Sequence, residues 1–170
     1  VSRQARRIST TDKRGSFMGS NYSYTDLDKL RVEDFRQEIS GAETINGREC
    51  YLLKRTPVSQ DVINKTGYHQ VNIWIDKKNY LVMRQDFFDI KGVVFKQMLT
   101  KEVSTIDGVD SIVLSTTEHL VNRTLSEMRF NDLRYNLPLE DRLFTQAIIR
   151  SGISATDIPA KNLVSQTPSL

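Results

Sequence analysis

Few residues in this chain are of types that could perform catalysis or hold a metal. The two histidines, His69 and His119, fall in separate predicted strands, and neither stands in a metal-binding spacing such as HExxH. Cys50 is the single cysteine and has no histidine positioned beside it, and the chain has neither a GxSxG motif nor a phosphate-binding P-loop. The carboxylates of Asp86 and Asp89 lie beside a predicted turn, where solvent exposure accounts for them. We therefore predict that the protein is not an enzyme and uses no metal and no cofactor.

Length and charge argue against two further classes, membrane-spanning and nucleic-acid-binding proteins. A chain of 170 residues can form one domain that buries roughly 70% of its unfolded surface. No apolar run approaches the ~20 residues that a membrane-spanning helix needs. The net charge is +3, and the basic residues at the start of the chain are not interleaved with aromatic ones as in RNA-binding modules, so we predict no nucleic-acid partner.

The dominant hydrophobic period is two, which is typical of strands. Val71, Ile73 and Ile75, for example, alternate with polar residues and share one face. Short turn signals such as Asn46-Gly47 and Asp107-Gly108 separate these runs and leave no room for crossover helices, so the sheet is predicted to be an antiparallel meander. The pattern predicts strands over residues 3–9, 36–44, 48–56, 68–76, 80–89, 93–106, 110–119 and 122–134.

Two helical segments are predicted beside the sheet. Thr25, with Asp28 three residues later, is a weak N-terminal signal for a helix over 26–31. Pro138 opens a second apolar pattern that Gly152 ends. We predict a mainly β (α+β) fold, a curved antiparallel sheet or incomplete β-barrel with short capping helices, in one domain over residues 1–150, followed by a flexible tail over 151–170.

One face of the predicted sheet mixes apolar with small and amide side chains. Gln85, Gln97, Thr116, Thr124 and Ser126 stand between larger apolar residues, which a tightly packed core would not favour. One interpretation is a cavity for an acyl chain; the other is a two-layer core in which one or two strand faces are misassigned. The predicted cavity lining is Ile73, Met83, Phe87, Phe95, Leu114, Met128 and Phe130.

A loop rich in aromatic residues and glycine precedes the first helical signal. The stretch RGSFMGSNYSYTDL, residues 14–27, has glycines at Gly15 and Gly19 that we predict to act as hinges. Such a loop is expected at the mouth of a ligand cavity. The predicted lid residues are Phe17, Met18, Tyr22, Tyr24 and Leu27.

The same loop carries a family resemblance that continues along the chain. RGSFMG and SYTDL are followed, in order, by INGRECYLL, VNIWIDKKNYLVMRQDFFDIKG, KEVSTIDG and RFNDLRYNLPLEDRLFT. This series resembles the periplasmic LolA-like outer-membrane lipoprotein-sorting proteins over most of residues 3–150. Relative to that family the chain is expected to lack an N-terminal part, which would leave strand 3–9 as an edge able to pair with another copy.

The resemblance implies a function. It implies a carrier in the periplasm of a Gram-negative bacterium that shields lipoprotein acyl chains, or another lipid, in a hydrophobic cavity during transport to the outer membrane. An inner-membrane transporter and an outer-membrane acceptor would then be its partners. The alternative is a non-enzymatic periplasmic adaptor of a lipid exporter, with a filled core, that acts through protein–protein contact.

Overall fold

The computed structural model describes residues 8–9, 12–154 and 157–158. The chain divides into two units, residues 8–133 and residues 1–7 with 134–170. The first unit contains the sheet. Within the described part of the second unit are a 3₁₀ helix, Asp141–Phe144, and helix α2, Gln146–Ser151, where the sequence predicted one continuous helix.

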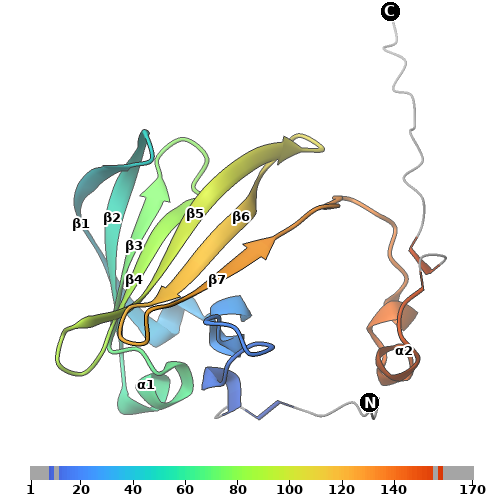
Figure 1. Cartoon of the computed structure of the whole chain (residues 1–170), viewed down its shortest axis with the longest axis horizontal. Helices are drawn as coiled ribbons and strands as arrows, with labels where there is room; N and C mark the ends of the chain where they lie inside the picture. The colour runs from blue at the N-terminus through green and yellow to red at the C-terminus, as the bar shows by residue number, and fades with distance from the viewer. Residues whose placement is uncertain (1–7, 10–11, 155–156, 159–170) are drawn as a thin grey trace, which may run out of the picture. The chain divides into compact units, whose positions relative to one another are not determined.

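The first unit is built on a single antiparallel sheet (Figure 1). Its strands follow the chain in the order β1-β2-β3-β4-β5-β6-β7, so every connection joins neighbours. Among the described residues the first and last strands do not pair with each other, and the sheet stays unclosed. The predicted fold class is thereby confirmed. The strands are β1 Phe35–Ile45, β2 Arg48–Pro57, β3 Gln70–Asp76, β4 Val82–Phe88, β5 Val94–Ile106, β6 Val109–His119 and β7 Thr124–Arg129.

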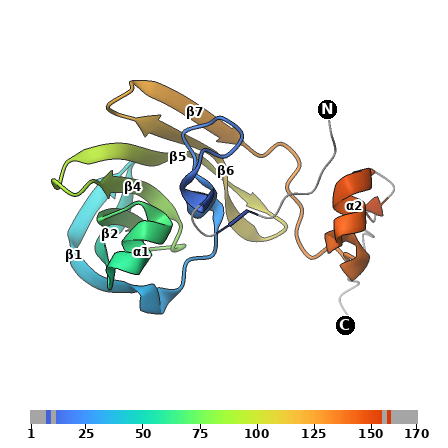
Figure 2. The same cartoon turned by 90° about the horizontal axis from the view of Figure 1, so that it is seen from below.

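Short helices lie within the curve of the sheet (Figure 2). Helix α1, Gln60–Thr66, was not predicted; Ser59 caps its first turn, and Gly67, at φ 81°, ends it. Three 3₁₀ helices, Asp12–Arg14, Tyr24–Leu27 and Val32–Asp34, belong to the segment before β1. The helix predicted over 26–31 is therefore a single 3₁₀ turn that starts earlier.

The predicted strand over residues 3–9 is the one strand prediction that has no counterpart here. Residues 3–7 lie outside the described residues, and Ile8 and Ser9 are not part of a strand. The predicted strand over 122–134 ends at Arg129. Self-association through residues 3–9 therefore stays a prediction.

The two-residue turns predicted from the sequence are present. Asn46 and Gly47 have φ of 49° and 77°, and Asp107 and Gly108 have φ of 51° and 80°. Positive φ at both central residues is the geometry of the type I′ hairpin turn, whose twist matches that of the strands it joins. These turns fix the β1–β2 and β5–β6 hairpins.

Replacement of Gly47 by Val should destabilise the protein by about 1–2 kcal/mol, because a side chain disfavours the left-handed backbone region. Gly41 in β1 offers a matched control, since its φ is not in that region and a Cβ there would meet nothing within 4 Å. Urea unfolding of Gly47→Val and Gly41→Val gives the free energy of unfolding of each variant. Equal stability of the two variants would contradict the turn geometry.

A buried carboxylate stabilises the β3–β4 turn. Asp76 accepts hydrogen bonds from the Arg48 Nη1 at 2.8 Å and from the backbone N–H of Lys78 at 2.7 Å. Burial raises the pKa of Asp76, but these hydrogen bonds lower it more, and the result lies below the usual 3.8.

Because the folded pKa of Asp76 is depressed, this group stabilises the fold above the unfolded pKa, and the contribution is lost as pH falls through the folded pKa. We expect the free energy of unfolding to decrease between about pH 5 and pH 2, and to decrease less in Asp76→Asn. Urea titrations across this range provide the measurement. Parallel curves for the two proteins would exclude Asp76 as a source of acid sensitivity.

Strand pairing divides the apolar residues between the two faces of the sheet. Directly paired residues share a face, and the pairs Val71–Phe87, Phe87–Lys96 and Thr117–Ser126 belong to the face that the N-terminal segment covers. The opposite face carries the pairs Leu52–Trp74, Trp74–Arg84 and Leu99–Thr116. We call the first the lid face and the second the Trp74 face.

Each face has its own apolar cluster. Tyr68, Val71, Ile73 and Phe87 form one on the lid face. Ile45, Cys50, Trp74 and Met83 form the other. The single inner face predicted from the sequence is therefore wrong: Gln97, Leu114 and Thr116 lie on the Trp74 face. The reason is a set of β-bulges in the β3–β4, β4–β5 and β5–β6 pairings, each of which reverses the alternation along a strand.

Candidate lipid-binding site

Residues 12–34, which we call the lid segment, contain a small hairpin. Ser16 pairs with Ser23, and the Phe17 N–H donates to the Tyr22 carbonyl at 2.7 Å. Met18 and Gly19 form its tip, with φ of 51° and 78°. Gly19 thus needs the freedom of glycine, whereas Gly15 is required for a different reason: a Cβ there would lie 2.9 Å from the Asp12 carbonyl oxygen.

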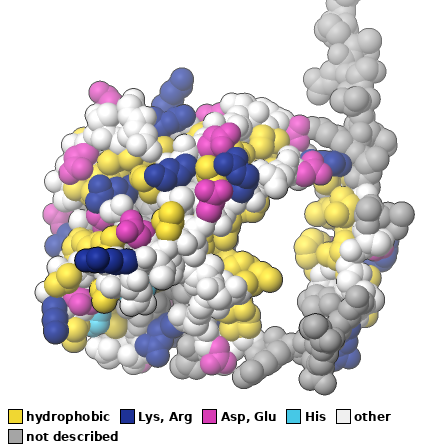
Figure 3. All heavy atoms as spheres, viewed as in Figure 1, with side chains coloured by type: hydrophobic (Ala, Val, Ile, Leu, Met, Phe, Trp, Pro, Cys, Tyr) yellow, Lys and Arg dark blue, Asp and Glu magenta, His cyan; other side chains and the backbone are white. Residues whose placement is uncertain are grey.

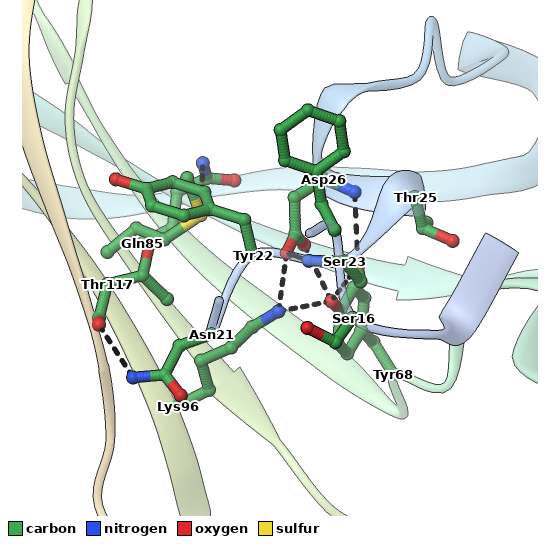
Figure 4. Close-up of polar contacts among 12 residues, drawn as sticks. Ser16, Asn21, Tyr22, Ser23, Thr25, Asp26, Tyr68, Gln85, Lys96 and Thr117 are labelled. Atoms are coloured by element: carbon green, nitrogen blue, oxygen red, sulfur yellow. Dashed lines mark hydrogen bonds and ion pairs between the residues drawn. The ribbon is translucent and has the colours of Figure 1, made fainter. Parts of the chain in front are cut away.

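Two residues of this hairpin anchor it to the far strands of the sheet (Figure 4). The Asn21 side chain donates to the carbonyls of Thr117 and Thr124 at 3.1 and 2.7 Å. Tyr22 is only 2% exposed, and its hydroxyl lies 2.9 Å from the Ser115 Oγ. The lid segment is therefore docked on β6 and β7 by both polar and apolar contacts.

A buried ion pair fastens the next part of the lid segment to the middle of the sheet. The Lys96 Nζ lies 2.7 Å from the Asp26 Oδ2, and the two side chains are 5% and 1% exposed. The Tyr68 hydroxyl donates to the Asp26 Oδ1 at 2.6 Å and also accepts from the Lys96 ammonium. Figure 4 shows Lys96, Asp26 and Tyr68 converging with Ser23. We call these four residues the latch.

Two residues of the latch, Lys96 and Tyr68, have pKa values that are shifted by their surroundings. Burial lowers the pKa of Lys96, and Asp26 opposes that effect. Burial also raises the pKa of Tyr68, reinforced by the negative charge of Asp26. The Tyr68 hydroxyl therefore stays protonated and donates to Asp26. The Lys96 ammonium also lies 4.4 Å from the centre of the Phe87 ring, which offers it a second favourable contact.

The local sequence explains why Asp26 is held in place. Ser23 and Asp26 form a capping box, in which the Ser23 Oγ accepts from the Asp26 N–H at 3.2 Å and the Asp26 Oδ2 accepts from the Ser23 N–H at 2.6 Å. The sequence analysis placed this cap two residues later, at Thr25 and Asp28. Thr25 is instead buried, and its hydroxyl donates to the Lys13 carbonyl at 3.1 Å.

A cavity of about 300 Å³ lies between the lid segment and the lid face of the sheet. This volume is at the small end of the range for ligand sites. A neighbouring cavity of about 210 Å³ shares Thr25, Asp28 and Leu30 with it, so the two adjoin along this stretch of the lid segment. The larger cavity is lined by Thr25, Asp26, Asp28, Leu30, Arg55, Tyr68, Gln85 and Phe87.

The predicted lid residues occupy different environments. The rings of Phe17 and Tyr24 pack edge to face, with centroids 5.5 Å apart. Tyr22 is buried under the hairpin, whereas Met18 is 85% exposed at its tip and Leu27 is exposed. None of these five residues lines the 300 Å³ cavity. Their role in ligand binding stays a prediction.

The predicted cavity residues are brought together only in part. Phe87 lines the cavity, Ile73 and Phe95 belong to its apolar cluster, and Met128 pairs with Ser115 on the same face. Met83 packs in the cluster of the Trp74 face, and the register places Leu114 on that face too. Phe130 follows the end of β7 and is 49% exposed.

Several residues of the site were missed in the sequence. No prediction was made for Lys96, which stands between Phe95 and Gln97, two residues expected on the inner face. Strict alternation along the strand would turn Lys96 to the opposite face. The bulge between Phe87 and Phe88 in the β4–β5 pairing reverses that alternation. A lysine amid the apolar run of β5 was the available signal, but nothing near it in sequence identified Asp26 as its partner.

Among residues 8–9, 12–154 and 157–158, no group of three His, Cys, Asp or Glu side chains is placed to hold a metal ion. Cys50 is buried, and burial raises the pKa of its thiol. Among the same residues, no helix has the length and apolar character needed to cross a membrane.

Comparison with known proteins gives one family and several solved structures. A family model whose description reads “-like: Uncharacterized protein” matches residues 1–151. No curated protein matches the chain. A DUF1329 family protein from Desulfovibrio piger is 29% identical, with a TM-score of 0.76, over 85% of this chain and 59% of that one.

Two further structures carry descriptions that refer to lipoprotein sorting or the LolA superfamily. A domain described as an outer membrane lipoprotein-sorting protein domain, from Vibrio parahaemolyticus, is 26% identical, with a TM-score of 0.75, over 85% of this chain and 60% of that one. A LolA superfamily protein from Nitrosomonas europaea is 18% identical, with a TM-score of 0.60, over 79% of this chain and 60% of that one; this likeness shows a shared fold alone. The chain thus spans about three-fifths of the structures it matches. The resemblance to LolA-like proteins and the half-barrel fold that it implied are confirmed.

Proposed function

Because this chain belongs to the family of uncharacterized proteins whose model matches residues 1–151, and because its fold is LolA-like, we propose that it is a periplasmic carrier of lipid acyl chains. It would shield a lipoprotein acyl chain, or another lipid, during transport to the outer membrane. The outer-membrane lipoprotein-sorting description of the Vibrio parahaemolyticus domain supports both the compartment and the cargo class. The proposed activity is binding, with no catalytic step.

The observation that carries the proposal is the 300 Å³ cavity under the lid segment. Phe87, Leu30 and the ring of Tyr68 supply the apolar part of a lining that is otherwise polar, and a second cavity adjoins it along residues 25–30. Movement of this stretch would join the two cavities. Each CH₂ group of an acyl chain that leaves water for such a site contributes about 0.8 kcal/mol, so a modest length of buried chain gives tight binding.

Release then requires a change in the lid segment. The latch holds that segment closed through one ion pair and its hydrogen bonds. In this proposal Gly15 and Gly19 are the hinges, and Phe17, Met18, Tyr22, Tyr24 and Leu27 contact the cargo once the lid has moved. The lid-face residues Ile73, Phe87, Phe95 and Met128 line the opened site. An inner-membrane transporter would load it and an outer-membrane acceptor would unload it.

Native mass spectrometry tests the proposal. The protein is expressed with export to the periplasm of a Gram-negative bacterium and purified without detergent. The expected result is a population whose added mass corresponds to an acyl-chain-bearing molecule, recovered by solvent extraction. Absence of any such adduct, together with no binding of a fluorescent fatty acid, would refute a carrier.

The alternative is the adaptor that acts through protein contacts. It predicts a filled core and an exposed apolar patch. On the face shown in Figure 3, charged side chains lie among the apolar ones over the sheet. The same mass spectrometry experiment separates the two functions, because an adaptor would carry no lipid.

A further inference from the structure

The charges around the 300 Å³ cavity do not balance. Three charged residues line it: Asp26, Asp28 and Arg55. Asp26 is paired with Lys96 at 2.7 Å, and Asp28 with Lys13 at 2.6 Å. Among the described residues, no carboxylate lies within 4.0 Å of the Arg55 guanidinium. One positive charge therefore remains uncompensated at the wall of this cavity.

Arg55 is held toward the cavity by its neighbours. It pairs with Val71 in the β2–β3 register, which places its side chain on the lid face. Its guanidinium lies 4.9 Å from the centre of the Phe35 ring. Its Nε is buried and has no hydrogen-bond acceptor among the described residues. A buried donor without an acceptor is costly, and burial lowers the pKa of Arg55 accordingly.

A guanidinium is suited to one kind of ligand group. Its N–H donors form a planar fork that matches the two oxygens of a carboxylate or phosphate. The rest of the cavity wall includes the apolar side chains of Phe87 and Leu30 and the amide of Gln85. This combination places an anion-binding group beside two apolar side chains that a hydrocarbon chain can contact.

We propose that Arg55 binds the anionic head group, a carboxylate or phosphate, of an amphiphile whose hydrocarbon chain lies along Phe87 and Leu30. This inference rests on the proposed carrier function and specifies its cargo class. The head group supplies the acceptor that the Arg55 Nε lacks and balances the charge of the cavity. A neutral lipid of the same chain length would leave the positive charge of Arg55 unbalanced.

Isothermal titration calorimetry with four defined ligands tests this assignment. Oleate and oleoyl lysophosphatidate carry the two head groups, oleyl alcohol is neutral, and inorganic phosphate has no chain. For the wild-type protein, the two anionic lipids should bind about ten- to hundredfold more tightly than the alcohol. The stronger of the two identifies the head group.

Variants at two adjacent positions provide the matched comparison. Arg55→Gln should abolish the preference for anionic lipids and leave the affinity for oleyl alcohol unchanged, and Arg55→Lys should keep part of the preference. Lys54→Gln removes a positive charge from the preceding residue of β2. Lys54 is exposed and pairs with Asn72 on the Trp74 face, so this variant should bind all four ligands as the wild-type protein does. If Arg55→Gln does not fold, the wild-type and Arg55→Lys comparisons still decide the question.

The outcomes separate this inference from the carrier function. Equal binding of oleate and oleyl alcohol by the wild-type protein would overturn the role of Arg55 and leave a carrier of neutral chains. Inorganic phosphate bound as tightly as the lipids would mean a site for a free anion, which also overturns the inference. If none of the three lipids binds, the carrier function itself fails.

Discussion

Asp26→Ala should lower the free energy of unfolding by about 3–5 kcal/mol, which is the usual cost of removing one partner of a buried ion pair. The Lys96 side chain is 5% exposed in the intact pair, and the variant removes the carboxylate that lies beside its ammonium. The double variant Asp26→Ala/Lys96→Met should recover part of this loss, since it removes both charges. Urea unfolding of the single and double variants measures the effect.

A second lysine–aspartate pair in the same segment is the control. Lys13 and Asp28 lie 2.6 Å apart, but their side chains are 37% and 39% exposed. Exposed pairs contribute about 0–1 kcal/mol, so Asp28→Ala should be close to wild type. Similar losses for Asp26→Ala and Asp28→Ala would mean that the latch does not hold the lid segment in solution.

Tyr22→Ala should destabilise the protein by about 3–5 kcal/mol, a loss typical of a large buried ring replaced by alanine. Tyr22 is 2% exposed, and its hydroxyl contacts Ser115 in β6. Removal of the ring would leave a void between the lid segment and the sheet. Thermal and urea unfolding give the size of the loss.

Two further variants separate the contribution of the Tyr22 ring from that of its hydroxyl and from that of an exposed neighbour. Tyr22→Phe removes only the hydrogen bond to Ser115 and should cost about 1 kcal/mol. Met18→Ala changes an exposed side chain of the same hairpin and should have almost no effect. A Tyr22→Ala protein as stable as Met18→Ala would show that the hairpin is not docked on β6.

The sheet could be predicted from the sequence because its determinants are local. The period-two pattern marks each strand, and Asn46-Gly47 and Asp107-Gly108 specify hairpin turns that the structure contains. Short connections then permit only neighbouring antiparallel strands. Helix α1 was missed because its seven residues, between Ser59 and Gly67, are too few for a clear helical period.

The faces of the strands could not be predicted in the same way. A bulge inserts one residue and exchanges the two faces beyond it, and no composition signal marked the bulges beside Trp74 or Phe87. Gln97 and Leu114 were assigned to the wrong face for this reason. The site depends on these faces, so its residues were predicted less well than its fold.

The latch could not be predicted from the sequence for a different reason. Asp26 and Lys96 are separated by 70 residues, and each alone has the pattern of an ordinary surface charge. Only the fold shows that both are buried and paired. The hairpin of the lid segment is held by Asn21, Tyr22 and the latch, and its role as a lid stays a prediction.

Photo-crosslinking with a fatty acid that carries a diazirine on its chain tests the central claim most directly. The protein is irradiated with bound ligand, and labelled residues are identified by tandem mass spectrometry, with excess unlabelled oleate as competitor. The carrier account predicts competed labels around the cavity, on Leu30 of the lid segment, on Tyr68 and on the lid-face residues Phe87 and Met98. Labels confined to the Trp74 face, on Leu52, Trp74 or Leu99, or labels that oleate does not displace, would contradict it.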